Sequence, residues 1–312
     1  MVHATLTPNS YIEHHHRRLK KGSYIYMCGN SLGLATKDAE ECVLEVMKRW
    51  KDEGIKIWTV DDNKYYLYSK YLSKLMAPVV GADPDEIAIF GGTTINIHQA
   101  ISTFYKPTKH KYKILVDDIN FPTDRYAIDR SSAAFYINRR HFKRLPGLAG
   151  WYGNKIKTQF LLRQDFDHQQ DANGWQIGTP NVLSMASLEG ALRVINEAGI
   201  PNMRKKSLHI TGYLMHLIEL KLREYGFAIG NLREDKRRGG HVCLEHDEGY
   251  RISIALKERG VVADFREPNV IRLTPTALYT SYEEVYKIVE ILLDIVKTES
   301  YKNIGMNRNY VV

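Results

Sequence analysis

The sequence has few cysteines and no long apolar run. Its three cysteines, Cys28, Cys42 and Cys243, share no CxxC spacing and cannot all pair, which excludes a disulfide framework and predicts free thiols in a reducing cytoplasm. The longest apolar stretches have the length of a strand, and the N-terminus has no apolar signal core, so we expect neither a membrane span nor secretion. The histidine run near the N-terminus has no second ligand group at a defined spacing, so we predict no metal site.

Positive charge is in excess, with 44 Lys and Arg against 36 Asp and Glu in 312 residues and a formal net charge of +8. The basic residues are spread along the chain, which argues against nucleic-acid binding. An anionic small molecule is a ligand that fits this charge better. The hydrophobic fraction of 44% is typical of a globular protein, and the length is enough for two cores.

Alternating strand and helix patterns predict an α/β fold. The predicted strands are 86–90, 112–116, 133–137, 241–245, 261–264 and 270–273. The predicted helices begin after Thr36 and cover 64–77 (ended by Pro78), 95–105, 181–198, 203–225, 250–259 and a last helix that opens with the capping box Ser281-Tyr282-Glu283-Glu284. We expect an N-terminal arm with a turn at 1–35, a large domain with a mainly parallel sheet at 36–200, and a small α/β domain at 201–312.

Two glycine-containing turns are candidates for binding. The turn Gly29-Asn30-Ser31-Leu32-Gly33-Leu34 lets the backbone pass close to a ligand and offers an amide and a hydroxyl. Gly91-Gly92-Thr93-Thr94 stands between a strand end and a helix start, where free N–H groups favour a phosphate. A simple N-cap that uses one threonine explains the second turn equally well.

Three further segments carry side chains suited to a ligand, each with a plainer explanation. The segment 120–124 places Phe121 and Asp124 directly after a strand, where α/β sheets bind ligands, although it also fits an ordinary turn. Trp151, between glycines, and Thr179, in a loop that leads into a helix, are compatible with either packing or ligand contact. Arg272 is a charge in an apolar strand, which requires a carboxylate partner on the protein or on a ligand.

Taken together, these segments resemble kynureninase, a pyridoxal 5'-phosphate enzyme of fold type I, the aspartate-aminotransferase fold. The resemblance follows the family's order from about Tyr24 to Val296. The matching stretches are 29–34, 93–98, 121–124, 150–153, 178–180, 204–207 and 260–268, the last continuing through Arg272 to Pro275 and Tyr279.

The resemblance implies a role for each candidate residue. Thr93 and Thr94 would hold the cofactor phosphate, and Phe121 would lie against the pyridine ring with Asp124 nearby. Trp151 and Thr179 would reach the cofactor from the neighbouring subunit of a homodimer with shared active sites. Ser31 and Arg272 would line the substrate pocket, with Arg272 binding the amino-acid carboxylate.

The family's reaction is the hydrolysis of L-kynurenine, or its 3-hydroxy form, to anthranilate, or its hydroxylated form, and L-alanine. The resemblance therefore implies a cytoplasmic hydrolase of tryptophan catabolism and NAD biosynthesis that acts on a small amino acid, without a nucleic-acid or membrane partner.

One central segment of the family is missing from this chain. Between Arg130 and Ser131 the sequence passes directly from the stretch before that segment to the strand after it, so on the order of a hundred residues are absent. The missing part carries the Schiff-base lysine and the aspartate that pairs with the pyridine nitrogen. Lys155 and Lys157 have no family counterpart in the lysine's role, and Asn154 stands where the family commonly has histidine.

Three hypotheses follow. The first is a kynureninase whose middle is absent from this 312-residue form, which we then expect to be inactive. The second is a catalytically dead remnant that dimerises or binds a phosphate ligand without chemistry. The third, a cysteine-desulfurase-like lyase of the same fold, is disfavoured by the turn at 29–34 and the stretch 265–273.

Overall fold

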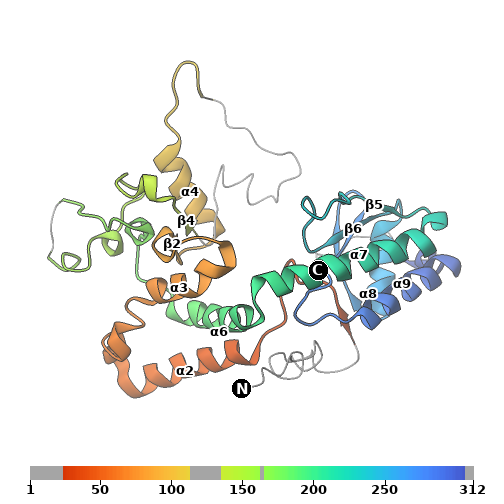
Figure 1. The fold of residues 1–312 in the computed structure, drawn as a ribbon, viewed down its shortest axis with the longest axis horizontal. Coiled ribbons are helices and arrows are strands. Elements are labelled where there is room, and N and C mark those ends of the chain that lie inside the picture. The colour runs from red at the N-terminus through yellow and green to blue at the C-terminus, as the bar shows by residue number, and fades with distance from the viewer. Residues whose placement is uncertain (1–23, 113–134, 162–164, 306–312) are drawn as a thin grey trace. The chain divides into compact units, whose positions relative to one another are not determined.

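The computed structural model describes residues 24–112, 135–161 and 165–305. The chain forms two compact units, a central unit, Asp38–Asn196, and a terminal unit made of Met1–Lys37 together with Glu197–Val312. In Figure 1 the described part of the terminal unit combines the red segment that follows the grey start of the colour bar with the teal and blue segments before its grey end. Described residues far apart in the sequence, 24–37 and 197–305, therefore contribute to one unit.

The terminal unit is built on a four-stranded antiparallel sheet with the strand order β5-β6-β9-β8. Its strands are β5 Ala228–Ile229, β6 Val242–Glu245, β8 Asp264–Arg266 and β9 Val270–Leu273. Successive side chains of a strand point to opposite faces. The register places Cys243 and Asp264 on either side of Arg272, which gives the sheet one polar face. The opposite face is apolar and buried, with Val242, Leu244, Ile271 and Leu273.

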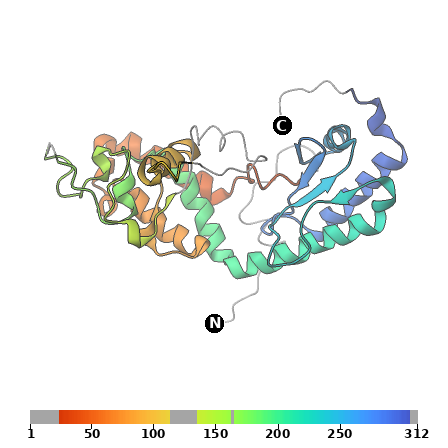
Figure 2. The same cartoon turned by 90° about the horizontal axis from the view of Figure 1, so that it is seen from above.

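Three helices pack against the apolar face of this sheet (Figures 1 and 2), namely α7 Ile200–Lys221, α8 Gly249–Glu258 and α9 Tyr282–Lys297. The stripe of α9 that enters the core consists of Val285, Ile288, Val289 and Leu292, all fully buried. The predicted capping box is confirmed, because the Glu284 N–H donates to Ser281 Oγ at 3.1 Å and the Ser281 N–H donates to Glu284 Oε2 at 2.8 Å.

The N-terminal strand β1, Ile25–Tyr26, pairs in parallel with β7, Val261–Val262. The Met27 N–H donates to the Val262 carbonyl at 2.8 Å, and the Thr274 N–H donates to the Met27 carbonyl at 2.9 Å. Met27 is fully buried in the core of the terminal unit. The N-terminal segment is thus integrated into the sheet region that carries Arg272.

The central unit packs helices around a two-stranded antiparallel pair. Its elements are α2 Lys37–Glu53, α3 Tyr68–Val80, β2 Ile87–Ala88, α4 Thr93–Phe104, β4 Phe135–Tyr136 and α6 Val182–Ala198. Val46, Tyr68, Leu72 and Ala186 join α2, α3 and α6 in one buried cluster. The helices α2 and α6 approach closely at Gly190, where a Cβ atom would lie 2.2 Å from the Ala39 nitrogen.

The α/β class predicted from the sequence is confirmed, whereas the prediction that Pro78 ends a helix is wrong. The helix α3 continues through Pro78 to Val80 and ends at Gly81, which adopts a left-handed φ of 68°. A proline in the last turn removes only one N–H donor, and the left-handed glycine then stops the helix. The strand predicted at 112–116 lies, apart from Tyr112, outside the described residues. None of the helices in the described ranges combines the length and the apolar character that a bilayer span requires.

Candidate functional site

The guanidinium of Arg272 lies on the polar face of the four-stranded sheet and is paired with a carboxylate of the protein. Arg272 Nε donates to Asp264 Oδ2 at 2.7 Å, and Arg272 Nη2 donates to the same oxygen. Asp264 is 3% exposed, so it depends on its cationic partner. Arg272 Nη1 has no hydrogen-bond partner among the residues that the structure describes. One edge of the guanidinium is therefore occupied and the other is available to a ligand.

Two arginines lie close to the Asp264 carboxylate. Arg266 Nη2 is 3.6 Å from Asp264 Oδ2, and Arg272 Nη2 is closer to the same oxygen. Burial lowers the pKa of His241, and the nearby Arg272 lowers it further, so this imidazole is uncharged at neutral pH. Burial likewise raises the pKa of the Cys243 thiol, which stays protonated. The unoccupied edge of the Arg272 guanidinium suits a ligand with a carboxylate.

The glycine-framed turn is connected to this arginine through Asn30. Asn30 Nδ2 lies 3.5 Å from Asp264 Oδ2, and Thr274 Oγ1 donates to Asn30 Oδ1 at 2.7 Å. The Ser31 N–H donates to the Cys28 carbonyl at 3.1 Å, which closes the turn and leaves the Ser31 side chain exposed. Ser31 and Arg272, both predicted as substrate contacts, thus belong to the same unit.

The two glycines of this turn have different roles. A Cβ atom on Gly29 would lie 2.2 Å from Thr276 Oγ1 and 2.7 Å from the Tyr279 hydroxyl, whereas a Cβ on Gly33 would meet nothing within 4 Å. The sequence argument assigned both glycines to close approach by a ligand. The structure shows instead that Gly29 is required by the packing of the protein itself, and that Gly33 has open space around it.

The start of α4 has the features of a phosphate-binding site. Its N-cap is Gly92, which has no side chain to occupy the first-turn N–H groups, and Gly91 has a φ of 62°. A Cβ atom on Gly91 would lie 2.9 Å from Asn96 Oδ1, so the backbone conformation and the space both require glycine. Thr93 and Thr94 form the first turn of α4. This glycine cradle at a helix N-terminus fits the phosphate of pyridoxal phosphate.

Buried polar side chains of α4 hold the loop that follows β4. Gln99 Nε2 donates to the carbonyls of Leu148 and Trp175 at 2.9 and 3.2 Å, and the Leu148 N–H donates back to Gln99 Oε1 at 3.0 Å. The Gly147 N–H donates to Thr103 Oγ1 at 2.8 Å. The helix with the phosphate cradle is therefore fixed to the loops around residues 147 and 175.

The same loops carry Trp151 and Thr179. A Cβ atom on Gly150 would lie 1.9 Å from the Ile177 carbonyl oxygen, so the backbones of the two loops are in direct contact. Trp151 is 40% exposed, and its ring packs edge-on against Tyr152 with the centroids 5.1 Å apart. Thr179 is exposed. The structure brings these two predicted cofactor contacts onto adjacent loops of the central unit.

The predicted residues that the structure describes fall into two groups, and one further residue was missed. Ser31 and Arg272 belong to the terminal unit, and Thr93, Thr94, Trp151 and Thr179 belong to the central unit. The predicted residues Phe121 and Asp124 lie outside the described residues. The sequence argument missed Asp264, and it offered the Asn30 amide to a ligand without foreseeing its contact with Asp264. Only the strand register shows that Asp264 faces Arg272.

Several lysines of the central unit are engaged in ion pairs. Lys70 Nζ lies 3.1 Å from Asp171 Oδ2, and Lys155 Nζ lies 2.8 Å from Asp167 Oδ1. Lys64 Nζ lies 3.0 Å from an oxygen of Glu189. Each of these three amines is thus already engaged with a carboxylate of the protein, which does not suit an amine that must attack an aldehyde.

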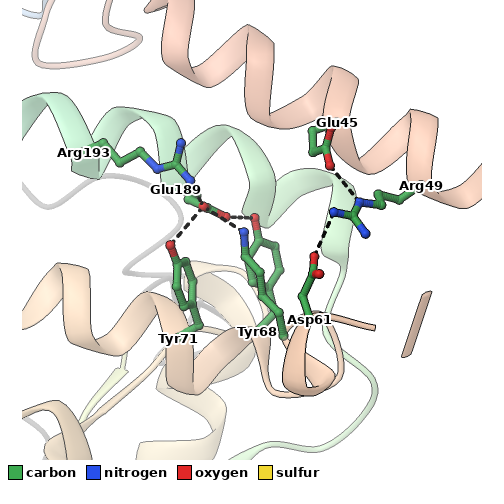
Figure 3. A network of polar contacts seen from close by, with 8 residues as sticks. Glu45, Arg49, Asp61, Tyr68, Tyr71, Glu189 and Arg193 are labelled. Carbon is green, nitrogen blue, oxygen red and sulfur yellow. Dashed lines mark hydrogen bonds and ion pairs between the residues drawn. The ribbon is translucent and has the colours of Figure 1, made fainter. Parts of the chain in front are cut away.

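Glu189 is the centre of a buried cluster, shown in Figure 3. Its carboxylate is 1% exposed and accepts hydrogen bonds from the Tyr68 hydroxyl at 2.5 Å and the Tyr71 hydroxyl at 3.2 Å, with Arg193 as a further cationic partner. Burial raises the pKa of Glu189, but the hydrogen bonds from Tyr68 and Lys64 outweigh it and hold the pKa below its ordinary value. The cluster joins α3 to α6, and Glu189 is the carboxylate that pairs with the Lys64 ammonium group.

Comparison with solved structures identifies the fold. A cystine C–S lyase, C-DES, in complex with cysteine persulfide matches with a TM-score of 0.67 at 11% identity, covering 88% of this chain and 98% of the other. The cysteine desulfurase CsdA from Escherichia coli matches with a TM-score of 0.64 at 11% identity, covering 95% of this chain and 100% of the other. At this identity the likeness concerns the fold alone.

Sequence comparison identifies the family. Residues 203–292 match the family model of the kynureninase C-terminal domain. A kynureninase of Geobacillus thermodenitrificans is 35% identical over an alignment of 392 positions, covering 92% of each protein, and one of Bacillus thuringiensis subsp. konkukian is 35% identical over an alignment of 397 positions, covering 94% of this chain and 93% of the relative. Both alignments are longer than the 312 residues of this chain, so the relatives contain positions that it lacks. The chain belongs to the kynureninase family.

Proposed function

We propose that this protein acts on L-kynurenine or 3-hydroxykynurenine, with hydrolysis to anthranilate or 3-hydroxyanthranilate and L-alanine as the reaction, and pyridoxal 5'-phosphate as the cofactor. The observation that carries the proposal is the open guanidinium edge of Arg272 in a chain of the kynureninase family. An amino-acid carboxylate matches this edge in both charge and geometry.

We assign one group of residues to cofactor binding and another to substrate binding. The first turn of α4, with Thr93 and Thr94, is proposed to hold the cofactor phosphate, and Phe121 and Asp124 to surround its ring. Arg272 holds the substrate carboxylate, and Ser31 lines the pocket beside it. Pyridoxal phosphate, when bound, supplies an electron sink for the loss of the α-proton. The protein's part is to bind, orient and shield the reacting groups.

We further propose a cytoplasmic homodimer in which Trp151 and Thr179 serve the neighbouring subunit. Both lie on adjacent loops, Thr179 is exposed, and Trp151 is partly so, which leaves them accessible to a second copy of the chain. The three cysteines are free, which is compatible with a reducing compartment. Size-exclusion chromatography with light scattering measures the oligomeric state, and a monomer would contradict the shared site.

The phosphate cradle and Arg272 fit the cofactor and the substrate, whereas three lysines of the central unit are held by carboxylates and offer no free amine as a cofactor anchor. Lys64, Lys70 and Lys155 are held in ion pairs. We therefore propose that the 312-residue form binds ligands without turnover, and that hydrolysis belongs to a form that contains the missing central segment.

Two measurements test this proposal. Sequencing genomic DNA and cDNA across the codons for Arg130 and Ser131 determines whether a longer reading frame exists. Anthranilate fluorescence then reports hydrolysis of L-kynurenine by the 312-residue form and by any longer form. We expect turnover in the longer form alone, and a loss of kcat/KM on the order of a hundredfold for Arg272→Met. Turnover by the 312-residue form, or an active Arg272→Met variant, would contradict the proposal.

A further inference from the structure

The long side chain of Arg272 can adopt several conformations, and a contact with a neighbouring residue can restrict it to one of them. An arginine side chain has several rotatable bonds, and ordering it has an entropic cost. Asp264 stands directly opposite Arg272 in the register of β8 and β9, within reach of a cross-strand side-chain pair. This neighbour is therefore the group that can set the guanidinium's orientation.

The contacts occupy one particular edge of the guanidinium. Nε donates to Asp264 Oδ2 at 2.7 Å, and Nη2 donates to the same oxygen. A carboxylate ligand in the usual parallel arrangement needs two N–H groups of one edge. Because Asp264 takes the Nε and Nη2 edge, the edge formed by Nη1 and the second hydrogen of Nη2 is the one that remains.

Asp264 is itself well fixed. It is 3% exposed and lies on a strand whose next residue, Phe265, pairs with the fully buried Ile271. Asn30, from the glycine-framed turn, adds a contact to Asp264 Oδ2 at 3.5 Å and is held on its other side by Thr274. The orientation of Arg272 is thus determined by the sheet on one side and by the turn on the other.

We propose that Asp264 is a positioning residue, which holds the Nε and Nη2 edge of Arg272 and thereby presents the Nη1 edge to the substrate carboxylate. This inference rests on the proposed function, because it assigns Arg272 to substrate binding. A positioning role and a simple charge effect predict opposite changes in carboxylate affinity when the Asp264 charge is removed. Removing the Asp264 charge makes the site more positive and would strengthen carboxylate binding, whereas loss of positioning weakens it.

The experiment uses the full 312-residue protein labelled with 15N-arginine and observed by NMR at the Nε–H groups. The Arg272 signal is identified by its disappearance in Arg272→Lys, which has no such group. In the ligand-free wild type we expect this hydrogen to exchange with water at least about tenfold more slowly than those of exposed arginines, because it is bonded to a buried carboxylate. Exchange as fast as that of exposed arginines would overturn the inference without any Asp264 variant.

The second step compares Asp264→Asn with Glu219→Gln, a control that removes the same charge from an exposed ion pair with Arg233 on the same unit. We expect Asp264→Asn to move the Arg272 signal toward the range of exposed arginines and to raise the dissociation constant of L-kynurenine by about tenfold. Glu219→Gln leaves both unchanged. Unchanged or tighter binding in Asp264→Asn would overturn the inference.

The two proposals fail in different ways. If L-kynurenine moves no arginine signal in the wild type, the proposed substrate binding is wrong, and the substrate role of Asp264 is overturned with it. The ligand-free spectra still decide whether Asp264 orders Arg272. If kynurenine binds and Arg272→Lys weakens it while Asp264→Asn does not, the proposed function survives and the positioning role is refuted.

Discussion

Replacing Glu189 by leucine is expected to destabilise the central unit by about 2–5 kcal/mol. The largest part comes from Tyr68, whose fully buried hydroxyl would lose its acceptor at a cost of about 1–3 kcal/mol. Lys64 and Arg193 contribute less, because their side chains are 21% and 49% exposed and can turn toward water. The hydroxyl of Tyr71 adds about 1 kcal/mol.

A double-mutant cycle isolates the contact between Glu189 and Tyr68. Tyr68→Phe alone removes one donor from the carboxylate, but in the Glu189→Leu background it removes an unpaired buried hydroxyl, so it should cost nothing there. We expect a coupling energy of about 1–3 kcal/mol. Glu45→Ala is the matched control, because it breaks an exposed pair with Arg49, also shown in Figure 3, and should change the stability by less than about 1 kcal/mol.

Urea unfolding followed by tryptophan fluorescence is the appropriate assay. All four tryptophans belong to the central unit, so their signal reports this unit separately; they are Trp50, Trp58, Trp151 and Trp175. Additive effects of Glu189→Leu and Tyr68→Phe within about 0.5 kcal/mol would refute the reasoning. So would a loss in Glu45→Ala as large as that in Glu189→Leu.

Three other outcomes are expected. Because the pKa of folded Glu189 is below its ordinary value, its stabilisation is complete above that value and is lost as the pH falls through the folded pKa; urea midpoints should drop from about pH 5 downward, and less steeply in Glu189→Leu. Gly29→Ala should destabilise the terminal unit by about 1–3 kcal/mol through overlap with Thr276, whereas Gly33→Ala changes thermal stability by less than about 0.5 kcal/mol; equal effects would contradict the packing argument. Ser281→Ala should cost about 1 kcal/mol by loss of the cap of α9, measured by hydrogen exchange in that helix, and unchanged protection would argue against it.

The elements that local sequence determines were predicted well. The last helix is one example, because its capping box and its stripe from Val285 to Leu292 are both local signals, and both are present in the structure. The strands around Val242 and Ile271 were also predicted close to their observed positions. Their antiparallel order was not, because pairing depends on contacts between residues far apart in the chain.

In the candidate site, too, local sequence predicted one residue, whereas its partner depends on the pairing of two strands. The sequence indicated that Arg272 needs a carboxylate, but it left open whether the protein or a ligand supplies it. The register of β8 and β9 identifies Asp264 as the protein's carboxylate. The two-residue strand β1 was missed for a similar reason, since only its partner Val261–Val262 makes it a strand.

The pairing of β1 with β7 has a consequence for synthesis of the chain. The central unit, Asp38–Asn196, is contiguous and has all of its residues once its last helix has emerged from the ribosome. The core of the terminal unit contains both Met27, near the start of the described residues, and side chains of α9, the last helix. Met27 therefore stays exposed during synthesis until nearly the whole chain has been made. A recombinant fragment that begins at residue 203, where the family match starts, would lack β1 and Met27 and leave a gap in its core. The unit of folding is therefore not the unit of sequence homology.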